Sequence, residues 1–312
     1  MNIIEMQDVT KKYGDFVALN HMNLEVHEGE ILGLLGPNGS GKSTCMNTIL
    51  SLLTYESGSI KIFGKEMKPD CYDIKRKIGV VFQDIAVFEE LNVYENIDYF
   101  CSLYIQDKKI RKQYVQDAIH LVNLEEFQKF KPKQLSGGLL RRLNIACGIA
   151  HKPQLIFLDE PTVAVDPQSR NHILEGIKTL NENGATIVYT THYMEEVEMI
   201  CDRIVIIDNG HMIASGTNDE LKNSIDLSER IRFDVENIDS SFIEGMKNIE
   251  GVMKVEKDSN TIQVYFHSKN HNLKNLLNYL DHNHITYDCL YSERPTLNDV
   301  FLELTGKELR DS

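Results

Sequence analysis

A glycine-rich stretch that ends in lysine, serine and threonine carries the clearest chemistry in this sequence. It reads GPNGSGKST, and its residues are Gly36, Pro37, Asn38, Gly39, Ser40, Gly41, Lys42, Ser43 and Thr44. The glycines allow successive backbone N–H groups to point into one concavity, which favours phosphate. Lys42 would reach the β- and γ-phosphates, and the Ser43 hydroxyl would contact Mg2+. The stretch predicts a bound nucleoside triphosphate. The alternative is a glycine-rich turn before an ordinary helix.

An acid pair, Asp159 and Glu160, forms a second candidate centre. It follows the apolar run 155–158, which is typical of a buried strand and would carry both acids to its C-terminal end. Asp159 would hold Mg2+, directly or through water. Glu160 would orient or deprotonate the attacking water. Acid pairs at strand ends also occur as caps, but this pair suits the phosphate-binding stretch.

A serine and two glycines, Ser136, Gly137 and Gly138, precede a segment with helical character. Free N–H groups and the helix dipole make such a start a second anion site. One chain rarely needs two such sites for one nucleotide. We therefore expect this site to complete the nucleotide site of a second copy of the chain.

Three further residues are candidates by position. Tyr13 precedes a glycine and could stack on a purine base, or it could be an ordinary core tyrosine. Gln83 follows the apolar run 78–82 and could reach a metal or water, or it could be a cap or surface residue. His192 ends the run 184–191 and could donate to the γ-phosphate or the water, or it could be structural.

The surrounding elements indicate an α/β domain over residues 1–222, with a helical insert at about 90–150. The phosphate-binding stretch lies between an apolar strand and a helix, as a phosphate-binding loop requires. In the insert, apolar residues recur at helical spacing without a strand signal. The other predicted strands lie at 3–9 and 22–26 in a small sheet, at 57–64 on an edge, and at 203–208 as the last strand of the domain.

A second domain is predicted over residues 229–312. Its order of strands and helices, β-α-β-β-α-β, is the split βαβ pattern of a small ferredoxin-like α+β domain. The last predicted strand is 285–290, and a final helix, 296–304, follows Pro295. The domain contains no constellation of chemical groups, so we interpret it as a regulatory or dimerising module.

Composition narrows the functional classes. The chain has 312 residues and a net charge of −14, which argues against non-specific binding to nucleic acid. Six cysteines without a C-x-x-C pair indicate free thiols in a reducing compartment. The first residues lack a signal-peptide pattern. No apolar run approaches the roughly 18–20 residues that span a bilayer. Action at a membrane would therefore need another chain.

In this order, the motifs resemble those of the ATP-binding subunits of ABC transporters, over residues 1 to about 222. The resemblance identifies 36–44 as Walker A, Gln83 as the Q-loop glutamine, and Leu135 to Gly138 as the signature. It also identifies 155–160 as Walker B. It makes Asp166 the D-loop aspartate, His192 the switch histidine and Tyr13 the adenine-stacking aromatic.

Two departures and the tail point to one branch of this family. Leu139 stands where the signature usually has glutamine, and the D-loop has Val-Ala-Val before Asp166 where Gly-Leu is commoner. Neither change removes a group that contacts phosphate. These features and the tail 294–306 are similar to the drug-exporter branch, the daunorubicin-resistance ATPases.

The resemblance implies a P-loop ATPase domain with an antiparallel β subdomain and a helical insert. It also implies a homodimer closed around two ATP and Mg2+, at the cytoplasmic face of the cell membrane. Hydrolysis would drive a separately encoded permease that exports a drug, lipid, peptide or similar cargo, as in antibiotic resistance. The alternatives are a soluble ATPase of this superfamily that acts on ribosomes or DNA, or an importer subunit.

Overall fold

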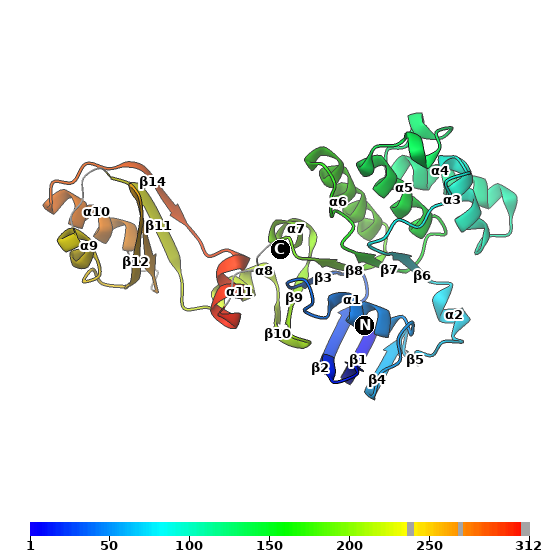
Figure 1. The fold of residues 1–312 in the computed structure, drawn as a ribbon, viewed down its shortest axis with the longest axis horizontal. Coiled ribbons are helices and arrows are strands. Elements are labelled where there is room, and N and C mark those ends of the chain that lie inside the picture. The colour runs from blue at the N-terminus through cyan, green and yellow to red at the C-terminus, as the bar shows by residue number, and fades with distance from the viewer. Residues whose placement is uncertain (236–239, 268–270, 307–312) are drawn as a thin grey trace. The chain divides into compact units, whose positions relative to one another are not determined.

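The computed structural model describes residues 1–235, 240–267 and 271–306 (Figure 1). These residues form two compact units, of which the first spans Met1–Thr217 and the second begins at Asn218. Within the described ranges, no helix combines the length and the apolar character that crossing a membrane would require.

A six-stranded sheet with strand order β10-β9-β3-β8-β7-β6 is the centre of the first unit. Five strands are parallel, and β10 pairs antiparallel with β9 at the edge. Strands β3, β7 and β8 are buried along their whole length, as expected of parallel strands covered on both faces. The strands are β3 (Ile31–Leu35), β6 (Ile78–Val81), β7 (Leu155–Asp159), β8 (Thr186–Thr191), β9 (Arg203–Asp208) and β10 (His211–Gly216).

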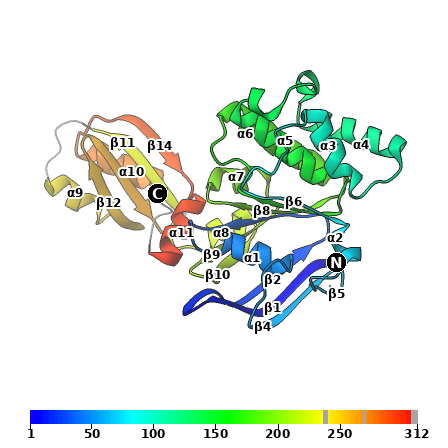
Figure 2. The same ribbon diagram turned by 45° about the vertical axis from the view of Figure 1, so that its right-hand side comes forward.

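The carboxyl ends of β3, β8 and β7 meet at one edge of this sheet, because the three strands are adjacent and parallel. Ligands bind at such edges in open α/β sheets. Helices follow the strands and cover the faces of the sheet (Figures 1 and 2). They are α1 (Lys42–Ile49), α5 (Gly137–Ile149), α6 (Pro167–Glu182) and α7 (Met194–Ile200).

A smaller antiparallel sheet, of order β2-β1-β4-β5, packs with α1 against the central sheet (Figure 2). Its first two strands are longer than predicted. Register shifts let polar residues keep pairing beyond the apolar segments, as far as Tyr13 with Phe16. The predicted edge position of β4 is wrong, since β4 pairs with both β1 and β5. The strands are β1 (Asn2–Tyr13), β2 (Phe16–His27), β4 (Ser57–Ile62) and β5 (Lys65–Glu66).

The insert is helical, as predicted. Asn92 and Glu95 form a capping box at the start of α3, and Asp107 caps α4 by accepting from Lys109 N and Ile110 N. Its elements are α3 (Val93–Ser102), α4 (Lys108–Leu121), η1 (Glu125–Phe127) and η2 (Pro132–Gln134). The short helix α2 (Tyr72–Lys75) precedes β6.

The second unit has an antiparallel sheet of order β12-β13-β11-β14. This order and the two intervening helices confirm the predicted ferredoxin-like pattern. Its core is apolar, with Ile231 and Phe233 of β11 against Leu276 and Leu280 of α10. The elements are α8 (Asn218–Asn223), β11 (Glu229–Asp234), α9 (Ser240–Met246), β12 (Val252–Asp258), β13 (Thr261–Phe266), α10 (Asn272–His282), β14 (Asp288–Glu293) and α11 (Leu297–Thr305).

Two strand predictions need correction. Strand β9 is not the last strand of the first unit, because the Asn209-Gly210 turn returns the chain as β10. Strand β14 begins at Asp288 and not at 285, because Ile285 and Tyr287 pack against the core from the preceding loop.

Candidate nucleotide-binding and hydrolysis site

The loop between β3 and α1 depends on its glycines. Gly39 and Gly41 have φ of 80° and 110°, which side chains rarely adopt. A Cβ on Gly36 would lie 2.2 Å from the Ile207 carbonyl oxygen, and one on Gly41 would lie 2.8 Å from that of Ala18. The loop therefore keeps its shape only without side chains at these positions, as a backbone phosphate cradle requires.

Lys42, the first residue of α1, turns its side chain back over this loop. Its ammonium donates to the Gly36 carbonyl (2.8 Å) and the Pro37 carbonyl (3.2 Å), and lies 3.2 Å from Glu160 Oε1. The side chain is only 4% exposed. Burial lowers the pKa of Lys42, and the nearby Glu160 carboxylate opposes this effect. The loop thus holds a buried positive charge where a triphosphate would bind.

Asp159, at the end of β7, brings oxygen ligands together. Its Oδ1 accepts from Ser43 Oγ (3.1 Å) and from Thr190 Oγ1 (2.6 Å). A carboxylate and a hydroxyl are ligands that Mg2+ accepts. Among the residues that the structure describes, no three His, Cys, Asp or Glu side chains gather around a metal position. The oxygens of Asp159 and Ser43 therefore suit Mg2+ if phosphate and water supply the other ligands. Mg2+ is usually bound in this way in nucleotide sites.

Glu160 occupies the position between Lys42 and His192. Its Oε1 faces the Lys42 ammonium, and its Oε2 lies 3.3 Å from His192 Nδ1. Its φ of 46° is left-handed, and strain of this kind costs about 1–3 kcal/mol. Its N–H donates to the Thr190 carbonyl (3.1 Å) and to Thr190 Oγ1 (3.0 Å), which holds the strained backbone against β8. The structure thus brings Lys42, Ser43, Asp159, Glu160 and His192 together.

The signature segment and Asp166 form a second cluster. Ser136 caps α5 by accepting from Leu139 N (3.3 Å), and Asp166 caps α6 by accepting from Ser169 N (2.9 Å). The hydrogen bonds from Ser169 lower the pKa of Asp166. A Cβ on Gly138 would lie 2.3 Å from Ser169 Oγ and 2.8 Å from Asp166 Oδ2, whereas Gly137 faces open space. Gly138 therefore lets the two helix starts pack together.

Among the residues that the structure describes, neither cluster shares a side-chain hydrogen bond or ion pair with Gln83 or Tyr13. Gln83 is exposed, two residues beyond the end of β6. Tyr13 ends β1 and is 48% exposed, with the Lys11 ammonium 5.3 Å from its ring centroid. Its open ring remains compatible with stacking on a base.

Two residues of α5 that belong to none of the sequence motifs hold the Gln83 segment. Arg141 Nη1 donates to the Gln83 carbonyl (2.6 Å) and the Phe82 carbonyl (3.3 Å). Asn144 Oδ1 accepts from Ala86 N (3.0 Å). Both side chains are buried. The available signal was weak: Arg141 and Asn144 lie three positions apart in a mainly apolar helix that also contains Arg142.

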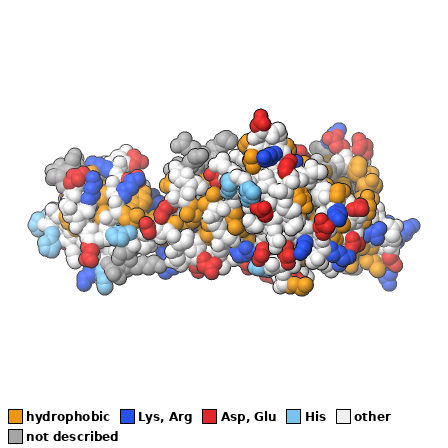
Figure 3. Space-filling view, turned by 90° about the horizontal axis from the view of Figure 1, so that it is seen from below, with side chains coloured by type: hydrophobic (Ala, Val, Ile, Leu, Met, Phe, Trp, Pro, Cys, Tyr) orange, Lys and Arg blue, Asp and Glu red, His pale blue; other side chains and the backbone are white. Residues whose placement is uncertain are grey.

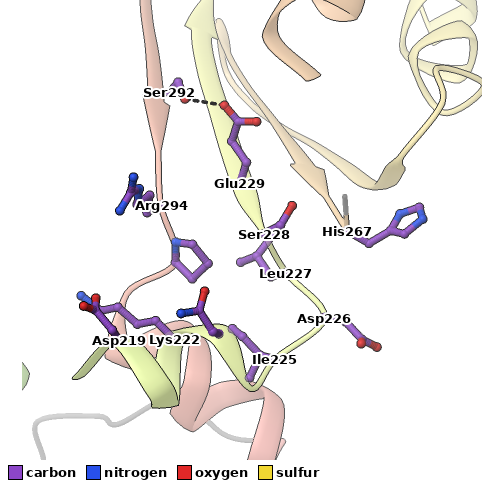
Figure 4. Close-up of a pocket in the computed structure, with 12 residues that line it drawn as sticks. Asp219, Lys222, Ile225, Asp226, Leu227, Ser228, Glu229, His267, Ser292 and Arg294 are labelled. Atoms are coloured by element: carbon purple, nitrogen blue, oxygen red, sulfur yellow. Dashed lines mark hydrogen bonds between the residues drawn. The ribbon is translucent and has the colours of Figure 1, made fainter. Parts of the chain in front are cut away.

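A hollow of about 610 Å³ lies in the second unit, near α8 and the start of β11 (Figure 4). Acidic residues such as Asp219 and Asp226 line it together with basic residues such as Lys222 and Arg294. Glu229 Oε1 accepts from Ser292 Oγ at 2.6 Å. Because acidic and basic residues both line it, the hollow has no dominant charge that selects a class of ligand.

The fold and the loop-and-acid cluster define a P-loop nucleotide hydrolase with an inserted helical region. The ABC transporter family matches residues 19–163, and the C-terminal domain family of ATP-binding proteins similar to DrrA1-3 matches residues 216–305. The linearmycin resistance ATP-binding protein LnrL of Bacillus subtilis (strain 168) is 38% identical over 99% of this chain and 100% of its own length. The chain therefore belongs to the ABC transporter ATP-binding proteins, in their drug-exporter branch, and is an ATPase.

Two other comparisons agree with this membership. The Nod factor export ATP-binding protein I of Cupriavidus pinatubonensis (strain JMP 134 / LMG 1197) is 33% identical over 99% of this chain and 92% of its own length. The ATP-binding cassette MJ0796, solved as a dimer in a post-hydrolysis state with ADP and Pi, is 31% identical with a TM-score of 0.63. It covers 69% of this chain and 98% of its own.

Proposed function

We propose that this chain is the ATP-hydrolysing subunit of an export system and drives a separately encoded membrane permease. The observation that carries this proposal is an exposed apolar groove between the helical insert and the central sheet. The permease would supply the membrane-spanning part and select the cargo. The chain would then lie at the cytoplasmic face of the cell membrane.

The groove has a volume of about 380 Å³ and is bounded by α3, α5 and the segment after β6. Its lining is mainly apolar and aromatic, and includes Phe82, Phe100 and Tyr104. At its rim, Leu52 is 55% exposed and Leu103 is 58% exposed. In Figure 3 hydrophobic side chains also reach the surface at the end of the first unit where α2 and the insert lie. Contiguous exposed apolar surface of this kind marks an interaction site.

The groove is linked to the signature at the start of α5 through the Gln83 segment. Phe82 lines the groove, and Arg141 binds the carbonyls of both Phe82 and Gln83. A shift of α5, which starts at the signature, would therefore move this segment as well. In this proposal, the movement that ATP binding causes in α5 is transmitted to the permease through the Gln83 segment.

For hydrolysis, we assign Lys42 and the 36–44 loop to the phosphates, with Tyr13 against the base. Ser43 and Asp159, with Gln83 as a further contact, would hold Mg2+, which would supply positive charge to the phosphates. When phosphates attract Lys42, Glu160 is released to orient the attacking water and accept its proton. His192 would hold Glu160 through the 3.3 Å contact and donate to the γ-phosphate.

We further propose that two copies face head to tail. Ser136 to Gly138 and Asp166 would then complete the nucleotide site of the partner. The dimeric MJ0796 cassette supports this arrangement, since it belongs to the same family. ATP would bind the closed pair better than the open pair, so binding closes the dimer and hydrolysis reopens it.

The cargo class follows only from relatives. LnrL is a linearmycin resistance protein, and the Cupriavidus protein is a Nod factor export protein. We propose export of a drug, a lipid, a peptide or a similar molecule, with antibiotic resistance as one outcome. Direct action on nucleic acid is not part of this proposal.

Affinity purification from detergent-solubilised membranes, followed by mass spectrometry, tests the permease proposal. We expect a stoichiometric multi-pass protein with the wild-type chain, and its loss with Leu103→Glu in the groove. Met253→Glu in the second unit is the matched control, because Met253 is also exposed (47%). Recovery of ribosomes, or of no membrane protein, would instead favour a soluble ATPase of the same family.

A further inference from the structure

Glu196, on α7, is a buried acid that the hydrolysis scheme leaves unused. It lies four residues after His192, and its relative exposure is 0%. The side chain of Glu195, the preceding residue in the same helix, is 76% exposed. A buried carboxylate is costly unless donors satisfy it. The groups that satisfy Glu196 therefore indicate what it does.

Three hydroxyls donate to this one carboxylate, and one guanidinium pairs with it. Thr162 Oγ1 donates to Oε1 (2.6 Å), and Arg170 Nε forms an ion pair with the same oxygen at 2.8 Å. Tyr189 OH (2.7 Å) and Thr191 Oγ1 (2.8 Å) donate to Oε2. The three hydroxyl-bearing residues are themselves buried, and Arg170 supplies the compensating positive charge.

The partners of Glu196 come from the three segments that carry the proposed machinery. Thr162 lies two residues after Glu160, and Thr191 directly precedes His192. Arg170 is in the first turn of α6, where its N–H donates to the carbonyl of Asp166 (2.9 Å). One carboxylate therefore fixes the segments of Glu160, His192 and Asp166 relative to one another.

Burial makes this arrangement selective. If one segment moved away, a hydroxyl or the carboxylate would lose its partner in a region without water to replace it. A fully satisfied buried network therefore allows one relative position of the three segments. Tyr193 strengthens the same corner, because its N–H donates to Thr191 Oγ1 (3.0 Å) and Arg170 lies 5.3 Å from its ring centroid.

We propose that Glu196 is a positioning residue for ATP hydrolysis, which holds Glu160 and His192 in register with the Asp166 segment. It lies outside the Lys42 cluster and makes no proposed contact with nucleotide. Its loss would therefore disturb the alignment of the attacking water more than the binding of ATP. This inference rests on the roles proposed above for Glu160 and His192.

The test is steady-state ATP hydrolysis by the full-length chain with Glu196→Gln, which has the same shape but lacks the charge. We expect kcat to fall about 10- to 100-fold, as for other residues that orient catalytic groups, while KM for ATP changes less than about threefold. Glu195→Gln is the matched control, because Glu195 is next in sequence and lies 3.6 Å from Arg170 but at the surface. We expect wild-type rates for this control.

Thr162→Val removes one hydrogen-bond donor while keeping the volume of the side chain. It is the second variant for the same test if Glu196→Gln fails to fold. It should lower kcat with little change in KM, and should add little to the defect of Glu196→Gln because both act through one network. A folded Glu196→Gln or Thr162→Val chain with wild-type kcat would overturn the proposal. So would a fall that tracks only the loss of folded protein. Wild-type turnover by Glu160→Gln would instead refute the role proposed for Glu160.

Discussion

The two units of this chain differ in whether they bury charged side chains. In the first unit, Lys42, Asp159, Glu160 and Glu196 are all buried and contact partners at the strand ends. In the described part of the second unit, no charged side chain is among the buried residues. There, ions such as Arg230 pair with Glu293 (3.1 Å) on the partly exposed side of the sheet.

Burying a charge costs free energy that an apolar side chain of the same size would not. A fold retains such groups where their chemistry is used, so buried and perturbed ions indicate a functional site. The second unit has an ordinary apolar core over Phe233 and Leu276. From this comparison we expect the chemistry to lie in the first unit, and we keep the interpretation of the second unit as a regulatory or dimerising module.

The largest expected effect is on Glu160. We expect Glu160→Gln to lower kcat about 10²- to 10³-fold, because the water loses its base while the loop and Lys42 remain. The chain should still bind ATP and should accumulate as a dimer, which size-exclusion chromatography with ATP can measure. A variant that stays monomeric with ATP and turns over normally would contradict the assignment.

Leu276 tests the other unit. It is fully buried in the apolar core, so Leu276→Ala should lower the free energy of unfolding of the second unit by about 2–5 kcal/mol. Urea unfolding followed with limited proteolysis would measure this change. We expect kcat to change less than about twofold below the unfolding range. A parallel loss of hydrolysis would show that the two units are not separable in function.

His151 should make a smaller contribution, to the pH dependence of the free energy of unfolding. Burial lowers its pKa to about 4 from 6.5, where it stacks on Tyr104 and its ring Nε2 lies 3.1 Å from the Ile78 carbonyl oxygen. The unfolded chain therefore takes up a proton near pH 6.5, and the folded chain only near pH 4. Stability present above pH 6.5 is lost as the pH falls towards 4, by about 2 kcal/mol at pH 5.

Thermal unfolding of the wild type and His151→Gln between pH 5 and 7.5 measures this contribution. The variant should show a flatter dependence, even if it is less stable at neutral pH. Equal slopes for the two proteins would mean that other groups cause the acid dependence.

The sequence was informative where chemistry depends on local spacing. The residues of the 36–44 loop and the two acids could be named from the chain alone, and so could most strands and helices. Long-range hydrogen bonds could not, because nothing in the spacing of Glu196 and Thr162 shows that they meet. The left-handed backbone of Glu160 was equally hidden, since glutamate has no preference for that conformation.

The predicted ends of some strands were wrong for a related reason. Periodicity reports which residues are buried, whereas pairing depends on the neighbouring strand. Tyr13 continues β1 beyond the apolar pattern because Phe16 is opposite it. Tyr287 has the apolar character of a strand residue but packs from a loop before β14.

The Lys42–Glu160 ion pair also bears on how the loop discriminates among anions. Any anion that attracts the lysine takes away the counter-ion of a buried carboxylate. Inorganic phosphate brings negative charge but no replacement cation for Glu160. A nucleoside triphosphate with its magnesium ion brings both. We therefore expect millimolar phosphate to compete poorly with ATP, which competition binding would measure. Glu160, the acid that we propose activates water, would then also protect the loop from an abundant cellular anion.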